Sequence, residues 1–308
     1  MNNRKMFWGI HPYVLLFISI LSVSISSILI KMSDTPTAVA GMYRLYISVL
    51  IMLPLVPWRT LRTLRLNASD WGSVIAAGLL LGMHFLFWME SLVHTSVASS
   101  MVILALQPLF VMIGSYFMFK ERVGIAKVLC LVAALFGSVI IAWGDIGVSR
   151  QALFGDALSL IGTLAVSAYF LVGQKVSRKM NANLYSVIVF LIGGSMLLVY
   201  SLWNQLPLTG YSGADWTYFL LLAIIPTMFG QYIFNLLLPS IGATTVSVGI
   251  IGEPVLAIVM AYLFLGEQMS AFQFTGGLLT LLGMGMYFWL QSLKRPIADY
   301  VPVDEPIR

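Results

Sequence analysis

The sequence predicts an all-α integral membrane protein whose ten transmembrane helices form two inverted five-helix repeats. Three observations predict this class: the composition, the spacing of long apolar runs, and an internal similarity at a shift of about 146 residues. Of the 308 residues, 59% are hydrophobic and only 9% are charged, and the mean hydropathy is +0.93. Soluble domains carry about 25% charged residues. We therefore expect a lipid bilayer to surround most of the chain.

Charged residues and turn signals divide the chain into ten apolar runs. Each is roughly 18 to 25 residues long, which is enough to cross ~30 Å of hydrocarbon at ~1.5 Å per residue. Arg4 and Lys5 precede the first run, which is long enough to span and is followed by no small-residue cleavage pattern, so it predicts a helix and not a signal peptide. The ten expected spans lie near residues 13–31, 37–56, 71–90, 96–118, 123–143, 155–175, 184–203, 216–238, 243–265 and 270–293.

The basic residues alternate between the two sides of these spans. Of the 17 Lys and Arg residues, 14 fall in segments on the side of the N-terminus. Lys31 and Arg150 fall on the other side, and Arg44 lies within a span. By the positive-inside rule, both termini are expected in the cytoplasm of a multi-pass protein of a bacterial-type plasma (inner) membrane. This placement accounts for the net charge of +5 without a nucleic-acid partner.

The two halves of the chain share residues at corresponding positions. Asp70-Trp71 and Asp215-Trp216 open the third and the eighth span. Residue pairs at a shift of 146 are Pro108 and Pro254, Tyr116 and Tyr262, Glu121 and Glu267, and Gly137 and Gly283. Because each half holds five spans, an odd number, the second must enter the membrane from the opposite face. We expect repeats at 13–143 and 155–293, followed by a cytoplasmic tail at 294–308.

The chain resembles the drug/metabolite transporter superfamily in its EamA-type ten-helix branch. The first half carries the resemblance in Gln107-Pro108, Phe119-Lys120-Glu121 and Gly137, and the early arginine of the second span, Arg44, also fits. The matching segments of the second half are Glu253-Pro254-Val255, Leu265-Gly266-Glu267, Gln273 and Gly277 to Gly283. Members of this family export amino acids, metabolites and drugs, or exchange nucleotide sugars, so the resemblance implies transport. His84 with Glu90 in the third span departs from the family pattern.

Two proline-containing positions at mid-membrane mark the expected site. Glu253-Pro254 and Gln107-Pro108 lie at matching places in otherwise apolar runs. Proline frees backbone carbonyls, and a carboxyl group at this depth is costly without a partner. Glu253 is therefore a candidate for proton coupling or for binding a substrate ammonium group, or it bonds to backbone freed by Pro254.

Further polar residues are candidates to bind a small-molecule substrate. Arg44 could hold a substrate carboxylate, or it could form an internal ion pair, with Glu90 as the expected partner. His84 and Trp88 share one helical stripe with Ser91 and could line a wet cavity or belong to the core. Gln231 and Asn235, four residues apart, could bind substrate or join helices. The candidate binding residues are Arg44, His84, Trp88, Gln107, Tyr169, Gln231, Asn235 and Glu253.

Other classes of function lack their motifs in this sequence. There is no phosphate-binding loop and no nucleophile motif, and His94 with Glu90 alone is too few ligands for zinc. We therefore expect no enzyme activity, no cofactor and no metal. The predicted function is a secondary transporter that exports small metabolites such as amino acids by alternating access, with protons as a candidate coupling ion. The alternatives are a broad exporter of drugs and aromatic compounds, and a membrane sensor or scaffold.

Overall fold

The structure is a computed structural model that describes residues 10–56, 66–143, 149–177, 179–265 and 269–294. Every regular element in these ranges is helical. In order they are α1 (Pro12–Ser24), α2 (Ser26–Lys31), α3 (Thr37–Met52), η1 (Leu53–Leu55), α5 (Ala68–His94), α6 (Val97–Leu104), α7 (Gln107–Phe119), α8 (Ile125–Ala142), α9 (Arg150–Val176), α10 (Ala182–Trp203), α11 (Gly213–Leu222), η2 (Ala223–Tyr232), α12 (Ile233–Ile241), α13 (Ala243–Ile250), α14 (Glu253–Leu265) and α15 (Ala271–Lys294).

Each of the ten apolar runs is helical in the structure. Eight helices or joined helices are long and apolar enough to cross a membrane, a further apolar helix is shorter (Ile125–Ile141), and α15 is helical over 24 residues. The all-helical class is thus confirmed for the described residues, and ten crossings with both termini in the cytoplasm stay predictions. Several residues on which the orientation and repeat predictions rest lie outside the described residues. They are Arg4, Lys5, Arg59, Arg62, Arg65, Glu267 and most of the expected tail.

The expected proline breaks are present in the fourth and ninth runs. Residues Ala105 and Leu106 separate α6 from α7, and Ile251 and Gly252 separate α13 from α14. Gln107 and Glu253 become the first residues of the second half-helices, with Pro in the second position, where its missing N–H would have no helical partner in any case. The break therefore places one polar side chain and one helix N-terminus at the centre of each of these two runs.

The helix boundaries repeat with the same spacing as the sequence. The starts of α5 and α11, at 68 and 213, are 145 residues apart, as are those of α3 and α10, at 37 and 182. The starts of α7 and α14, at 107 and 253, are 146 apart, as are those of α8 and α15, at 125 and 271. The structure thus repeats these four elements at the spacing that the sequence similarity predicts.

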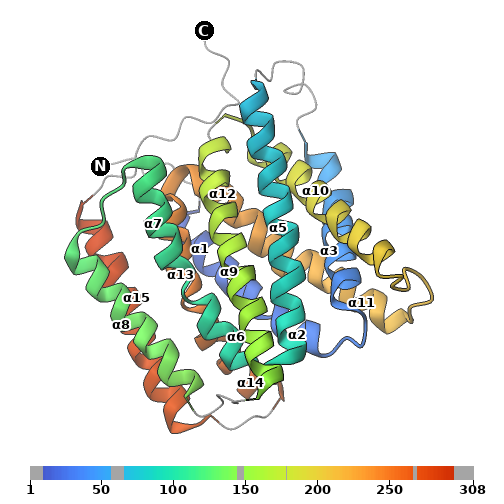
Figure 1. Cartoon of the computed structure of the whole chain (residues 1–308). Helices are drawn as coiled ribbons and strands as arrows, with labels where there is room; N and C mark the ends of the chain where they lie inside the picture. Colours follow the sequence, from blue (N-terminus) through green and yellow to red (C-terminus); the bar gives the residue numbers. More distant parts are fainter. Residues whose placement is uncertain (1–9, 57–65, 144–148, 178, 266–268, 295–308) are drawn as a thin grey trace.

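Small residues allow the helices to pack closely. A Cβ added at Gly78 or Gly82 of α5 would lie within 2.7 Å of side chains of α10. At the edge of the bundle α8 packs against α15 (Figure 1), and there a Cβ at Gly137 would lie 2.6 Å from the Gly276 carbonyl oxygen. Because lipid gives little hydrophobic drive for helix association, close backbone packing of this kind is a main source of helix–helix stability.

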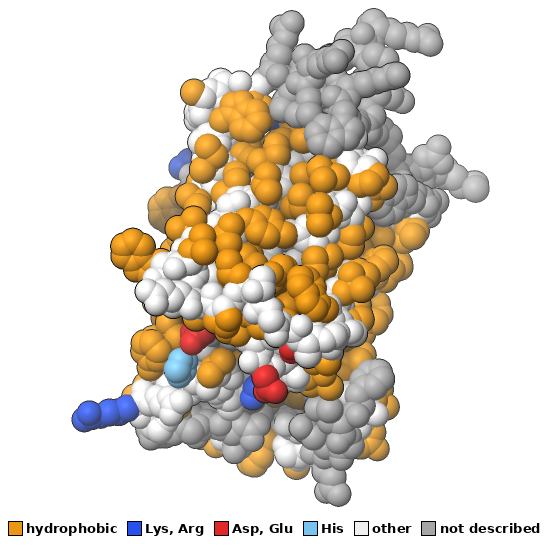
Figure 2. Space-filling model, turned by 90° about the vertical axis from the view of Figure 1, so that its right-hand side faces the viewer, with side chains coloured by type: hydrophobic (Ala, Val, Ile, Leu, Met, Phe, Trp, Pro, Cys, Tyr) orange, Lys and Arg blue, Asp and Glu red, His pale blue; other side chains and the backbone are white. Residues whose placement is uncertain are grey.

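The surface is apolar across the middle of the bundle. Figure 2 shows a broad band of hydrophobic side chains on the side of the molecule that carries α10 and α11, with acidic, basic and histidine side chains gathered mainly below it. A band of this kind is what a hydrocarbon layer requires of its protein surface. The structure thus supports a multi-pass membrane protein.

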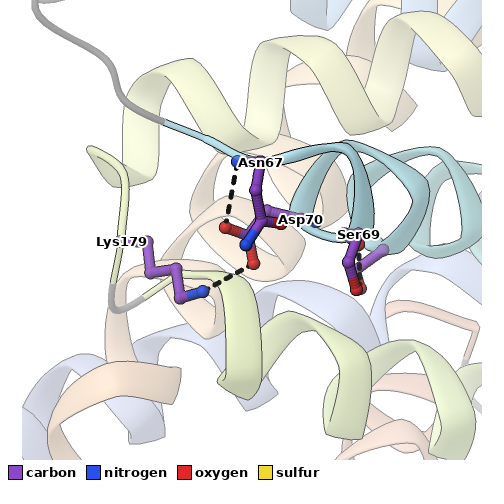
Figure 3. Close-up of polar contacts among 5 residues, drawn as sticks. Asn67, Ser69, Asp70 and Lys179 are labelled. Atoms are coloured by element: carbon purple, nitrogen blue, oxygen red, sulfur yellow. Dashed lines mark hydrogen bonds and ion pairs between the residues drawn. The ribbon is translucent and has the colours of Figure 1, made fainter.

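One ion pair fastens the beginning of α5 to the segment that follows α9. Asp70 closes a capping box with Asn67, whose side chain accepts from the Asp70 N–H at 2.8 Å (Figure 3). The same carboxylate accepts from Lys179 Nζ at 2.6 Å. Asp215 closes the equivalent capping box of α11 with Ser212. We call the end of the bundle where α5 begins the Asp70 face, and the end where α5 finishes the His94 face.

Candidate functional site

A small cavity of about 40 Å³ lies at the centre of the bundle, between the two broken helices. It takes residues from both halves of the chain, including the ends of α6 and α13 and the first residues of α7 and α14. Six of the eight predicted site residues line it: Arg44, His84, Trp88, Gln107, Gln231 and Glu253. The structure therefore brings together side chains that are up to about 210 positions apart in the sequence.

Arg44 is buried at 2% exposure and is held by hydroxyl groups in place of a carboxylate. Its Nε donates to Thr227 Oγ1 at 3.0 Å and its Nη1 donates to Ser26 Oγ at 3.2 Å, while Cζ lies 4.2 Å from the centre of the Phe85 ring. Two of the five guanidinium N–H groups are used in these bonds. The side chain is fixed in position, and N–H groups remain for a ligand in the cavity.

The predicted partnership of Arg44 with Glu90 is wrong. Glu90 accepts from Thr37 Oγ1 at 2.5 Å and lies 3.4 Å from His94 Nε2, outside the cavity. The i, i+4 spacing on α5 favours the His94 contact, and Thr37 begins the neighbouring helix α3. These local partners engage the Glu90 carboxylate near the His94 face.

One of the two hydroxyl groups that bind Arg44 comes from an irregular segment around Pro226. Residues Ala223–Tyr232 form a π-helix, and Pro226 has no N–H to donate to the Leu222 carbonyl. Thr227 Oγ1 donates to that carbonyl at 2.8 Å and accepts from Arg44. The helix is thus irregular around Pro226, and this irregular segment is part of the Arg44 site. Sequence reasoning missed Thr227 because Ser and Thr are common in membrane helices and carry no distinguishing signal.

His84 and Trp88 form one wall of the cavity, which agrees with one of the two alternatives that their helical spacing left open. The His84 Nδ1 atom lies 3.0 Å from the carbonyl oxygen of Gly162, and the His84 and Trp88 rings stack at 5.8 Å. A carbonyl oxygen can only accept, so Nδ1 carries the proton, and in the neutral ring Nε2 is left as an acceptor. Ser91, the third residue of the stripe, bonds to Ser100 at 2.8 Å and lies outside the cavity.

Glu253 is buried at 4% exposure and shares the cavity with Arg44. The two side chains are not within 4.0 Å of each other, so they form no ion pair. Among the described residues, no hydrogen bond to the Glu253 carboxyl group is found, although its backbone carbonyl accepts from Ser24 Oγ at 3.3 Å. The predicted alternative in which the carboxyl binds backbone freed by Pro254 therefore finds no support. A charged group buried without a partner is costly, so this geometry favours a ligand or a proton at Glu253.

Three buried N–H groups of the cavity residues have no acceptor within the described part of the chain. They belong to Trp88 Nε1, Gln107 Nε2 and Gln231 Nε2. Buried polar groups are almost always hydrogen-bonded in native proteins, and exceptions call for an explanation such as an absent ligand. Together with Arg44, these donors make the cavity suited to a ligand rich in oxygen acceptors.

Tyr169 and Asn235 do not line the cavity. The Tyr169 hydroxyl donates to Asn235 Oδ1, and Asn235 Nδ2 donates to Ser186 Oγ at 3.0 Å. Both residues are fully buried, so the geometry favours the helix-joining interpretation for Asn235, whereas Gln231 also lines the cavity. The cavity walls also include Phe85, Phe170 and Phe234, which a chain with 18 phenylalanines does not single out.

Comparison with known proteins identifies the family. The model of the EamA-like transporter family matches residues 11–143 and again residues 153–289. The transporter YoaV of Bacillus subtilis, described as uncharacterized, is 24% identical over 270 residues, which cover 85% of this chain and 90% of YoaV. An uncharacterized transporter of Archaeoglobus fulgidus is 26% identical over 227 residues, covering 71% of this chain and 78% of that protein.

A solved crystal structure has the same fold. It superimposes with a TM-score of 0.76 at 17% sequence identity and covers 92% of this chain and 99% of its own. At this identity the likeness shows the fold alone. The two matches of the family model fall on the two halves that repeat in sequence and in structure, and together they cover most of the chain. The chain therefore belongs to the EamA-like transporter family, within the drug/metabolite transporter superfamily.

Proposed function

We propose that this transporter exports a small zwitterionic metabolite, with amino acids as the leading class, across the plasma membrane by alternating access. The observation that carries the proposal is the placement of Arg44 and Glu253 around one cavity without an ion pair between them. A substrate carboxylate would accept from Arg44 and from the unpartnered N–H groups, and a substrate ammonium group would lie at Glu253. One zwitterion would then satisfy both buried charges at once.

Alternating access follows from the inverted repeat. Two similar half-structures that enter the membrane from opposite faces can exchange conformations, and each exchange would open the central cavity to the other side. The helix breaks before Gln107 and Glu253 lie next to the cavity, and a bilayer tolerates irregular backbone where protein or a cavity surrounds it.

A chemically matched substrate series tests the charge assignment. The protein would be reconstituted in liposomes loaded with an amino acid, with the amine that lacks its carboxyl group, or with the acid that lacks its amino group. We expect efflux of the amino acid to exceed that of both analogues. The Arg44→Ala variant should lose the preference for a carboxylate, and Arg150→Ala, which removes an exposed arginine at the start of α9, is the control. Equal efflux of all three compounds by the unmodified protein would refute the proposal.

Proton coupling is tested at the single acid of the cavity. We expect efflux to depend on the pH difference across the membrane in the unmodified protein and to lose that dependence in Glu253→Gln. Asp34→Asn, which changes an exposed acid in the connection before α3, is the matched control. A full pH response in Glu253→Gln would show that coupling does not run through this side chain.

The aromatic walls favour a second candidate function, export of drugs and aromatic compounds. Trp88, Phe85, Phe170 and Phe234 could hold flat apolar compounds without reading a carboxylate. This function predicts efflux of planar aromatic cations, such as fluorescent dyes, that survives Arg44→Ala. The substrate series and a dye-efflux assay on the same liposomes therefore separate the two candidates.

A further inference from the structure

The structure ties the two sides of the cavity together toward the Asp70 face. One unit, which we call unit A, consists of α5, α6, α7 and α9, and the other, unit B, consists of α1, α2, η2, α12, α13 and α14; each unit packs internally along its length. Thr244 of α13 donates to Ser115 Oγ of α7 at 3.2 Å and lies 3.2 Å from Glu121 Oε2 just after α7. Gln174 Oε1 of α9 accepts from the Ala243 N–H at 2.5 Å. Unit B is thus hydrogen-bonded to unit A in one layer.

This layer lies between the cavity and the Asp70 face. Ser115 is eight residues beyond Gln107, so it is about 12 Å further along the helix than the cavity at a rise of ~1.5 Å per residue. Gln174 is two residues from the end of α9, and Thr244 is the second residue of α13. The cavity itself is displaced the other way, because Trp88 is six residues from the end of α5 and twenty from its beginning. The Asp70 side of the cavity is the thicker one, and among the described residues the hydrogen bonds that join the two units lie on that side.

The inverted repeat allows the same layer to be examined at the other face. At the shift of 146 that relates α7 to α14 and α6 to α13, the counterparts of Ser115 and Thr244 are Ala261 and Ala98. At the shift of 145 that relates α3 to α10, the residue matching Gln174 in the sequence is Leu29. None of these three side chains has a hydrogen-bonding group. Glu121 does have a counterpart in the sequence, Glu267, which lies outside the described residues, but Ala98 has no hydroxyl group to donate to a carboxylate. The sequence therefore lacks at the His94 face the donors and the Ser115 acceptor of the bonds that it forms at the Asp70 face.

The difference extends to the N-termini of the helices that would move. The N-cap of α13 is Gly242, with φ of +83° and no side chain, so the N–H of Ala243 depends on Gln174 from the other unit. The corresponding residue of α6 is Ser96, whose hydroxyl accepts from the Ser99 N–H at 3.0 Å within its own helix. The start of α6 is thus satisfied without contact between the units, whereas the start of α13 is satisfied only when the units meet.

We propose that Ser115, Gln174 and Thr244 form a gate that closes the Asp70 face, and that its counterpart at the His94 face is missing by sequence. The two states of the transporter are therefore unequal, and the substrate-free protein rests closed at the Asp70 face with the cavity accessible from the His94 face. Each of these hydrogen bonds shifts the ratio of the two states by roughly two- to tenfold. This inference rests on alternating access as proposed above, and it requires no particular substrate.

Thiol labelling without substrate tests the gate. The single cysteine, Cys130, is replaced by alanine, and Leu104→Cys puts one reporter thiol on the cavity wall. A membrane-impermeant maleimide is then applied to right-side-out and to inside-out vesicles. We expect labelling mainly from the His94 face in this parent, and several-fold faster labelling from the Asp70 face after Thr244→Val or Gln174→Leu. Thr245→Val, which changes the neighbouring buried threonine, is the control and should label like the parent.

The reverse design supplies the missing groups. The variant Ala98→Thr with Ala261→Ser should slow labelling from the His94 face, because it gives these two sequence counterparts the hydroxyl groups that they lack. Each variant is first checked for folding by size-exclusion chromatography, and only variants that elute as folded protein are compared. Equal labelling of the parent from both faces, or no change in Thr244→Val and Gln174→Leu, would overturn the gate. Since labelling needs no substrate, a failed amino-acid assay would leave this result standing.

Discussion

The close packing of α8 on α15 leads to a quantitative prediction about Gly137. A Cβ built on Gly137 would lie 2.5 Å from Thr280 Oγ1 and 2.6 Å from both the Gly276 carbonyl oxygen and the Thr280 backbone nitrogen. Two of these three atoms belong to the backbone, so a change of side-chain rotamer cannot relieve the contact. The helices would have to separate by about 0.8 Å to reach an ordinary contact distance near 3.4 Å. The substitution Gly137→Ala therefore forces the two helices apart.

Three contributions set the size of the effect. Overpacking costs about 1–3 kcal/mol. Separation also weakens the hydrogen bond from Thr280 Oγ1 to the Ala134 carbonyl oxygen, now 3.2 Å, which contributes about 0.5–1.5 kcal/mol. Alanine is the better helix former by about 1 kcal/mol, which offsets part of this cost. The net expectation for Gly137→Ala is a loss of about 1–3 kcal/mol in the free energy of unfolding.

A glycine on the same pair of helices provides the control. A Cβ on Gly285 of α15 would meet nothing within 4 Å, so Gly285→Ala should stabilise the protein by up to about 1 kcal/mol. The assay is equilibrium unfolding in mixed detergent micelles as the SDS fraction rises, followed by tryptophan fluorescence. Gly283 is the repeat counterpart of Gly137. A Cβ added at Gly283 would lie 2.7 Å from the Ala134 nitrogen, so Gly283→Ala should behave like Gly137→Ala. Unfolding free energies of Gly137→Ala and Gly285→Ala within about 0.5 kcal/mol of each other would refute the packing argument.

Three further changes have expected outcomes. Gly162→Ala should lower substrate affinity more than it lowers stability. The added Cβ would lie 3.0 Å from a backbone nitrogen of α5. Efflux kinetics measure the affinity, and thermal unfolding measures the stability. Tyr169→Phe should destabilise the protein by about 1–3 kcal/mol, because it leaves the buried Asn235 oxygen without a donor; an unchanged unfolding midpoint would contradict this. Asp70→Asn should lower thermal stability by removing the ion pair with Lys179, and high salt should lower the stability of the unmodified protein toward that of the variant. A salt-independent difference between the two proteins would contradict the ionic origin.

The sequence by itself determined the class, the repeat and the two helix breaks. These features depend on local physics: apolar length sets the spans, and proline ends a helical hydrogen-bond ladder wherever it occurs. It also placed Arg44, His84, Trp88 and Glu253 among the cavity residues, because polar groups at membrane depth are rare enough to be conspicuous.

Only the tertiary structure decided which polar groups meet. Glu90 was expected beside Arg44 but bonds to Thr37, and Tyr169 and Asn235 were expected in the cavity but bond to each other. Partner choice depends on the rotation of each helix about its axis and on its neighbours. Those quantities arise from packing over many residues far apart in the chain, such as the close approach of glycines on α5 to α10. Hydroxyl groups such as that of Thr227 gain their roles only through that packing, because their side chains are too common in membrane helices to stand out in a sequence.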